Sequence, residues 1–102
     1  MINISVEKKN NYINKVTIKG HSGYSDYGSD IVCASVSSIA ITTVNAITRL
    51  ASDLIYFDEK DGFLTIEIKE NDRVVNTLVN NMLDLFRELE IDYPKNIKIK
   101  NN

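Results

Sequence analysis

The sequence has very few of the residues that build metal sites and disulfides. Cys33 is the only cysteine and His21 the only histidine among 102 residues, and tryptophan does not occur. A structural zinc site takes about four ligands, drawn mainly from cysteine and histidine. The sequence therefore excludes such a site, and it excludes a disulfide within the chain. We expect a protein that needs no metal or other cofactor and whose single thiol stays reduced in the cytoplasm.

A large excess of one charge and an uninterrupted apolar segment are also lacking. The formal net charge is −2, which argues against binding to the phosphate backbone of nucleic acids, so we expect no direct nucleic-acid contact. Residues 31–48 carry no charge, but serines, threonines and an asparagine interrupt them, which argues against a membrane span. No basic stretch followed by an apolar run begins the sequence, so we expect no signal peptide.

What is present suits one globular domain that covers residues 1–102, with 43% hydrophobic and 25% charged residues. Apolar residues at a spacing of two are typical of half-buried strands. The slip in that spacing between Ile13 and Val16 predicts either a β-bulge or a later start of the strand. The spacing predicts five strands. Two form a hairpin near residues 2–6 and 13–18 around a turn at 10–11, and two form a second hairpin near 54–59 and 63–69 around a turn at 60–62. The fifth strand is expected near residues 97–99.

Two helices complete the predicted order ββαββαβ. The first is expected over residues 31–52 with Asp30 as its N-cap, and the second begins at Asn71 or Asp72 and ends at Tyr93-Pro94. The fold class is therefore α+β, with both helices packed against five strands in small, mainly antiparallel sheets. The first helix is apolar or small on every face, which predicts that two layers of structure or a partner subunit enclose it.

Residues 20–29 contain three of the four glycines and have no apolar period. His21 lies near the start of this segment, and Cys33 follows its end. Cys33 would lie in the first turn of the first helix, where the helix dipole makes a thiol ionise more readily. The unpaired N–H groups there would also bind an oxyanion. If the segment folds back, the imidazole of His21 lies beside the thiol and forms a pair able to attack a carbonyl.

Each of these two residues also has an ordinary interpretation. A single cysteine near the start of a buried helix is usually a small core residue, and a single histidine at the end of a strand is usually a solvated loop residue. The spacing allows a Cys–His pair and does not require one. The alternative function is therefore a non-catalytic binding module in which Cys33 is merely packed.

The segment from Gly20 to Ser37 resembles the signature of the Prp (YsxB-like) ribosomal-processing cysteine proteases. The pattern GH…YG-x-DIVCA-x-x-S is matched by Gly20-His21, by the run from Tyr27 to Ala34, and by Ser37. The order of strands and helices on both sides agrees with the family as well, so the resemblance covers the whole chain.

The resemblance implies a small cytoplasmic endopeptidase. Its substrate would be the precursor of a large-subunit ribosomal protein (number twenty-seven), whose N-terminal extension is removed by cleavage after an aromatic residue. The family's nucleophile corresponds to Cys33 and its base to His21, while Gly20, Tyr27, Asp30 and Ser37 correspond to supporting or substrate-binding positions. The resemblance also implies a homodimer, and a mobile loop between His21 and Asp30 that becomes ordered over bound peptide.

Overall fold

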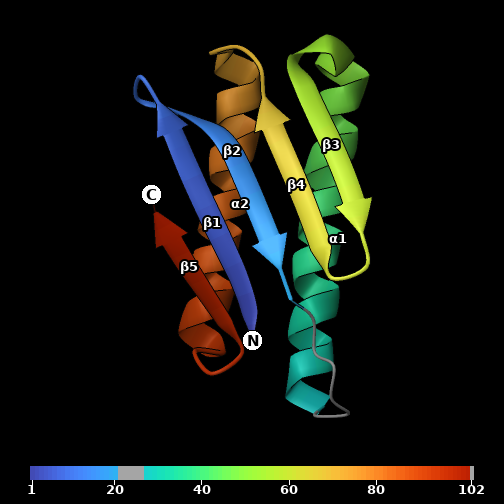
Figure 1. The fold of residues 1–102 in the computed structure, drawn as a ribbon, viewed down its shortest axis with the longest axis vertical. Helices are drawn as coiled ribbons and strands as arrows, with labels where there is room; N and C mark the ends of the chain where they lie inside the picture. The colour runs from blue at the N-terminus through green and yellow to red at the C-terminus, as the bar shows by residue number, and fades with distance from the viewer. Residues whose placement is uncertain (21–26, 102) are drawn as a thin grey trace.

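The computed structural model describes residues 1–20 and 27–101, and it describes only the backbone of residues 27–30. Five strands form one sheet in the order β3-β4-β2-β1-β5. Both long helices lie against the same face of this sheet, which gives two layers (Figure 1). The predicted class and element order are confirmed. The strands form one mixed sheet rather than several small ones, because β4 pairs with β2 and joins the two hairpins.

The first hairpin consists of β1 (Ile2–Lys9) and β2 (Tyr12–Lys19). Asn10 and Asn11 connect the strands, both with positive φ angles, as a two-residue hairpin turn requires. The pairing passes from Glu7 with Lys15 to Lys8 with Ile13, so Asn14 is the extra residue of a bulge. The predicted turn and the predicted bulge are both confirmed.

The second hairpin and the last strand complete the sheet. β3 (Ile55–Lys60) and β4 (Phe63–Ile68) are antiparallel, and β4 is also antiparallel to β2. β5 (Ile97–Asn101) runs parallel to β1 and is the only parallel partner among the described strands. Strands β3 and β5 therefore form the two edges of the sheet, and β3 is the edge nearest to α1 (Figure 1).

The first helix, α1, covers Tyr27–Ala51, and a short 3-10 turn, η1 (Ser52–Leu54), leads from it into β3. The predicted start near Ile31 is wrong by one turn, so Asp30 lies inside the helix and is not its N-cap. Aspartate is stabilised both at the N-cap and within the first turn, so the residue type alone did not locate the first residue. The predicted end near Ser52 agrees with the structure.

One stripe of α1 is buried against the sheet, and the opposite side is open in the single chain. Val32, Val36, Ala40, Val44 and Ile47 are the buried members, whereas Ile31 is 41% exposed. The sheet covers one side of this helix and α2 packs beside it, so the same chain leaves part of its surface open (Figure 1). Of the two alternatives, enclosure by a partner subunit stays a prediction. By length and composition alone residues 31–54 could cross a membrane, but a core helix packed on a sheet has the same composition.

The second helix, α2 (Arg73–Asp92), begins and ends where the sequence predicts. The carboxylate of Asp72 accepts a hydrogen bond from the Val75 N–H at 3.0 Å, which is the N-cap arrangement. Tyr93 is the C-cap. The buried face of α2 fills the centre of the core between α1 and the sheet with Val75, Val79, Met82, Leu83 and Phe86.

Candidate active site

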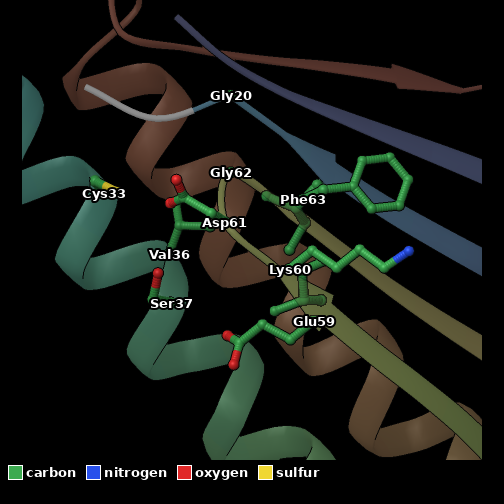
Figure 2. A pocket seen from close by; sticks show the side chains of 11 residues that line it. Gly20, Cys33, Val36, Ser37, Glu59, Lys60, Asp61, Gly62 and Phe63 are labelled. Atoms are coloured by element: carbon green, nitrogen blue, oxygen red, sulfur yellow. The ribbon is translucent and has the colours of Figure 1, made fainter. Parts of the chain in front are cut away.

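A cleft opens where the N-terminal half of α1 faces the end of β2 and the turn between β3 and β4. It has a volume of about 440 Å³. Ile18, Val36 and Leu64 provide its apolar part, and each is at most 7% exposed. Cys33, Ser37 and the segment 59–63 surround this part (Figure 2). Three elements that are distant in sequence therefore build one open, partly apolar depression.

Cys33 lines this cleft and is a free thiol. Its side chain is half-buried and packs against the hydrophobic core. The sequence predicts Cys33 in the first turn of the helix. Because α1 begins at Tyr27, Cys33 instead lies in the second turn. In the second turn of a helix, the backbone N–H already bonds to the carbonyl four residues earlier. The amide of Cys33 itself is therefore not a free oxyanion donor.

Ser37 lies one helical turn after Cys33, because residues four apart share a helix face. It is exposed and lines the same cleft, so the structure brings these two predicted site residues together. Figure 2 shows both side chains on the part of α1 that borders the cleft.

Gly20 ends β2 at the rim of the cleft. Its φ angle is 94°, and its N–H donates a hydrogen bond to the Gly62 carbonyl oxygen at 2.9 Å. A Cβ on Gly20 would lie 2.5 Å from the Met1 carbonyl oxygen. The local backbone therefore requires glycine here, both for its conformation and for its space.

The remaining predicted site residues fall at or beyond the limit of the described structure. His21 and the loop that follows it, residues 22–26, lie outside the described residues. Tyr27 is the first residue of α1 and Asp30 the fourth, but their side chains also lie outside the described part. Within residues 1–20 and 27–101, no group of three or more histidine, cysteine or acidic side chains could hold a metal ion.

Comparison with known proteins assigns the chain to a family of proteases. The family model described as "Cysteine protease Prp" matches residues 1–98. The chain belongs to this family. It is therefore a cysteine protease, as the signature at Gly20–Ser37 predicts.

Curated Prp relatives cover most of this chain. The ribosomal processing cysteine protease Prp of Staphylococcus aureus is 31% identical over 90 residues, which is 85% of each chain. The protein of the same name from Bacillus subtilis is 28% identical over 90 residues, 81% of this chain and 80% of its own.

Solved Prp structures share the whole fold. The S. aureus Prp structure with a substrate peptide has a TM-score of 0.92 and 26% identity over the full length of both chains. The S. aureus structure with a covalently linked product peptide has a TM-score of 0.89 and 27% identity, again over both full chains.

Sequence reasoning missed the contribution of the β3–β4 turn to the Prp cleft. Residues 60–62 were predicted only as a hairpin turn, yet Glu59, Lys60 and Asp61 line the cleft beside Cys33. No local signal marks them, because a charged turn is an ordinary solvent-exposed turn in sequence. Only the pairing of Lys19 with Phe63, which aligns β2 with β4, brings this turn to the end of β2.

Proposed function

We propose that this protein is an endopeptidase that removes the N-terminal extension of a large-subunit ribosomal protein (number twenty-seven). One observation carries the proposal: the only cysteine of the 102 residues lines an open cleft in a chain of the cysteine protease Prp family. The relatives are named for ribosomal processing, and the S. aureus structures contain a substrate peptide and a covalently linked product peptide.

In the proposed reaction the thiol of Cys33 transfers its proton to the imidazole of His21, and the sulfur attacks the scissile carbonyl carbon. The tetrahedral intermediate then loses its C–N bond, and the imidazolium donates its proton to the leaving amine. Water hydrolyses the remaining thioester, with His21 accepting the proton of the water and returning one to the sulfur. Backbone N–H groups near Cys33 stabilise the oxyanion. The candidates are the amides of residues 27–30, because the N–H groups of the first turn of α1 have no partner within the helix.

His21 follows Gly20 directly in the chain, and this connection supports its assignment as the base. Gly20 lines the cleft and is hydrogen-bonded to Gly62 of the β3–β4 turn, on the same wall, which faces α1. Covalent geometry keeps the Cα of the next residue about 3.8 Å away. Gly20 is in this scheme a positioning residue, and Asp30, Ser37 and Tyr27 support the site or contact the substrate.

The apolar part of the cleft supports cleavage after an aromatic residue. Ile18, Val36 and Leu64 come from three different elements and present buried aliphatic side chains at its base. An aromatic side chain buries about 150–250 Å² of surface when it is enclosed, so even partial enclosure here favours an aromatic over a small side chain on the acyl side of the scissile bond.

We further propose that the enzyme is a cytoplasmic homodimer. The nucleophilic thiol has no disulfide partner in the chain and must stay reduced, which a reducing compartment provides. The open side of α1 carries no charged residue from Ile31 to Thr48. With α2 it forms a groove whose apolar members are Ala34, Ile39, Leu85 and Leu89 and whose α2 side also carries Glu88 and Asp92. A second copy would remove this apolar surface from water.

A peptide that spans the junction of the ribosomal precursor tests the proposal. The unmutated protein should cut it at one position, and Cys33→Ala should reduce the rate to background. Thr77→Ala, on the exposed face of α2 and away from the cleft, is the matched control and should leave the rate unchanged. If Cys33→Ala cuts the peptide as fast as the unmutated protein, the catalytic role of Cys33 is refuted. Binding without cleavage by the unmutated protein would instead favour a ribosome-associated binding module.

A further inference from the structure

The turn between β3 and β4 brings two carboxylates to the cleft. Glu59 is the fifth residue of β3, and side chains alternate between the faces of a strand. It therefore shares the helix-facing side with Ile55 and Phe57. Asp61 follows β3 as the first residue of the turn. Figure 2 shows both carboxylates directed toward the side of the cleft formed by α1, where Cys33 and Ser37 lie.

The basic and aromatic neighbours of these carboxylates point the other way. In Figure 2 the ammonium group of Lys60 and the ring of Phe63 are directed away from α1. The ring of Phe63 instead lies 5.5 Å from the Nζ atom of Lys19, which is its neighbour across the β2–β4 pair. Lys60 is also one of the residues that line the cleft. The alternation of the hairpin nevertheless directs its ammonium group away from α1, whereas the two carboxylates are directed toward it.

Neither carboxylate has a cationic partner within the described part of the chain. The ion pairs found there join Lys15 with Glu67, and Asp84 with Arg87. Glu59 and Asp61 are exposed, so water solvates them when no peptide is bound. A concave surface that carries one sign of charge raises the local concentration of ligands of the opposite sign. The described wall opposite α1 therefore favours a positively charged group.

We propose that Glu59 and Asp61 are specificity-determining residues that select a peptide with a lysine or arginine side chain beside the scissile bond. This inference rests on the proposed function, because it concerns the same cleft and the same reaction. The apolar base would hold one uncharged side chain of the peptide, and the acidic turn would contact a cationic side chain near it. The substrate class is then a peptide with an apolar and a basic residue close to the cleaved bond.

Peptides that differ in one charge test this preference. A cleavable peptide is made with lysine, glutamine or glutamate at each position on either side of the scissile bond in turn, and kcat/KM is measured at low ionic strength. At one or more positions lysine should exceed glutamine by roughly 1.5- to fivefold, the usual range for an exposed ion pair. Glutamate should be cut more slowly than glutamine. The lysine preference should shrink at about 0.5 M salt, because salt at this concentration shortens the electrostatic screening length to a few ångströms.

Variants of the two carboxylates then connect the preference to the turn. The double change of Glu59→Gln and Asp61→Asn should abolish the preference, so that the lysine, glutamine and glutamate peptides are cut with equal kcat/KM. Asp58→Asn is the matched control, because Asp58 precedes Glu59 on β3 but belongs to the opposite face by alternation. It should retain the full preference. A purely structural role of Glu59 and Asp61 would lower the rates for all three peptides by the same factor.

Binding to the Cys33→Ala variant separates this inference from the proposed function. Fluorescence anisotropy with the same three peptides should give the order lysine, glutamine, glutamate, with or without a measurable cleavage rate. If the unmutated protein cuts no peptide but this order holds, the proposed function fails and the charge selection stands. If all three peptides are cut and bound equally, or if the double variant keeps the preference, the inference is overturned.

Discussion

The substitution Gly20→Ala tests how the end of β2 is held at the cleft. A φ angle of 94° belongs to a region that residues with a Cβ rarely adopt. The added Cβ would also lie 2.5 Å from the carbonyl oxygen of Met1. Met1 has little freedom to withdraw, because the adjacent Ile2 is buried and its N–H donates to the Asn96 carbonyl oxygen at 2.8 Å.

Two costs add up in this variant. A left-handed conformation costs a non-glycine residue about 1–2 kcal/mol, and relieving an overlap in a packed region costs about 1–3 kcal/mol. We therefore expect the free energy of unfolding to fall by about 2–5 kcal/mol, from a total of about 5–15 kcal/mol that is usual for a domain. Since about 1 kcal/mol lowers the Tm of a domain of this size by roughly 4–8 °C, Tm should drop by at least about 8 °C.

Thermal unfolding followed by circular dichroism measures this change. Gly62→Ala is the control for stability, because Gly62 also has a positive φ angle, 72°, while the contact with Met1 belongs to Gly20. The difference in Tm between the two variants then measures the cost of the overlap between the added Cβ of residue 20 and the Met1 carbonyl oxygen. Peptide cleavage at a temperature where Gly20→Ala is folded should fall by roughly a hundredfold, as for a displacement of about 1 Å in a catalytic group. An unchanged Tm for Gly20→Ala would refute the geometry described for this residue.

Two further predictions concern the nucleophile and the assembly. Because Cys33 lies beyond the first turn of α1, we expect His21 to activate its thiol. The variant His21→Ala should therefore slow both peptide cleavage and alkylation by iodoacetamide at neutral pH. Alkylation at the original rate would contradict this expectation. The exposed Ile31 and the groove at Leu85 predict a homodimer. Light scattering should give twice the monomer mass, and Ile31→Glu should shift the mass toward that of the monomer. A monomer mass at every concentration would count against the dimer.

Local features of the fold were predictable because neighbouring residues determine them. The pair Asn10-Asn11 identifies a turn with positive φ angles, and the slipped spacing after Ile13 identifies the bulge at Asn14. Asp72 and Tyr93 mark the ends of α2 for the same reason. In each case the side chain and the backbone that it stabilises lie within about four residues of each other, so the sequence contains the whole interaction.

Features that depend on distant pairing were not predictable in the same way. The sequence contains both hairpins, but nothing in either one states that β4 pairs with β2. Without that pairing the sheet order is unknown, and so is the position of Glu59 and Asp61 in the cleft. The predicted start of α1 was wrong for a different reason. Several residues before Ile31 are compatible with a first helical turn, and Asp30 suits both the N-cap and a position within that turn.

The hydrogen bond between Gly20 and Gly62 connects the two functions assigned to the cleft. Gly20 immediately precedes His21, the proposed base, and Gly62 immediately follows Asp61, one of the proposed selecting carboxylates. Both glycines have positive φ angles, 94° and 72°, so neither backbone shifts readily to accommodate another residue. A change at either glycine should therefore move the base and the acidic turn together. Because these two elements lie on either side of one backbone hydrogen bond, we expect the proposed substrate selection and the proposed base catalysis to depend on the same short contact.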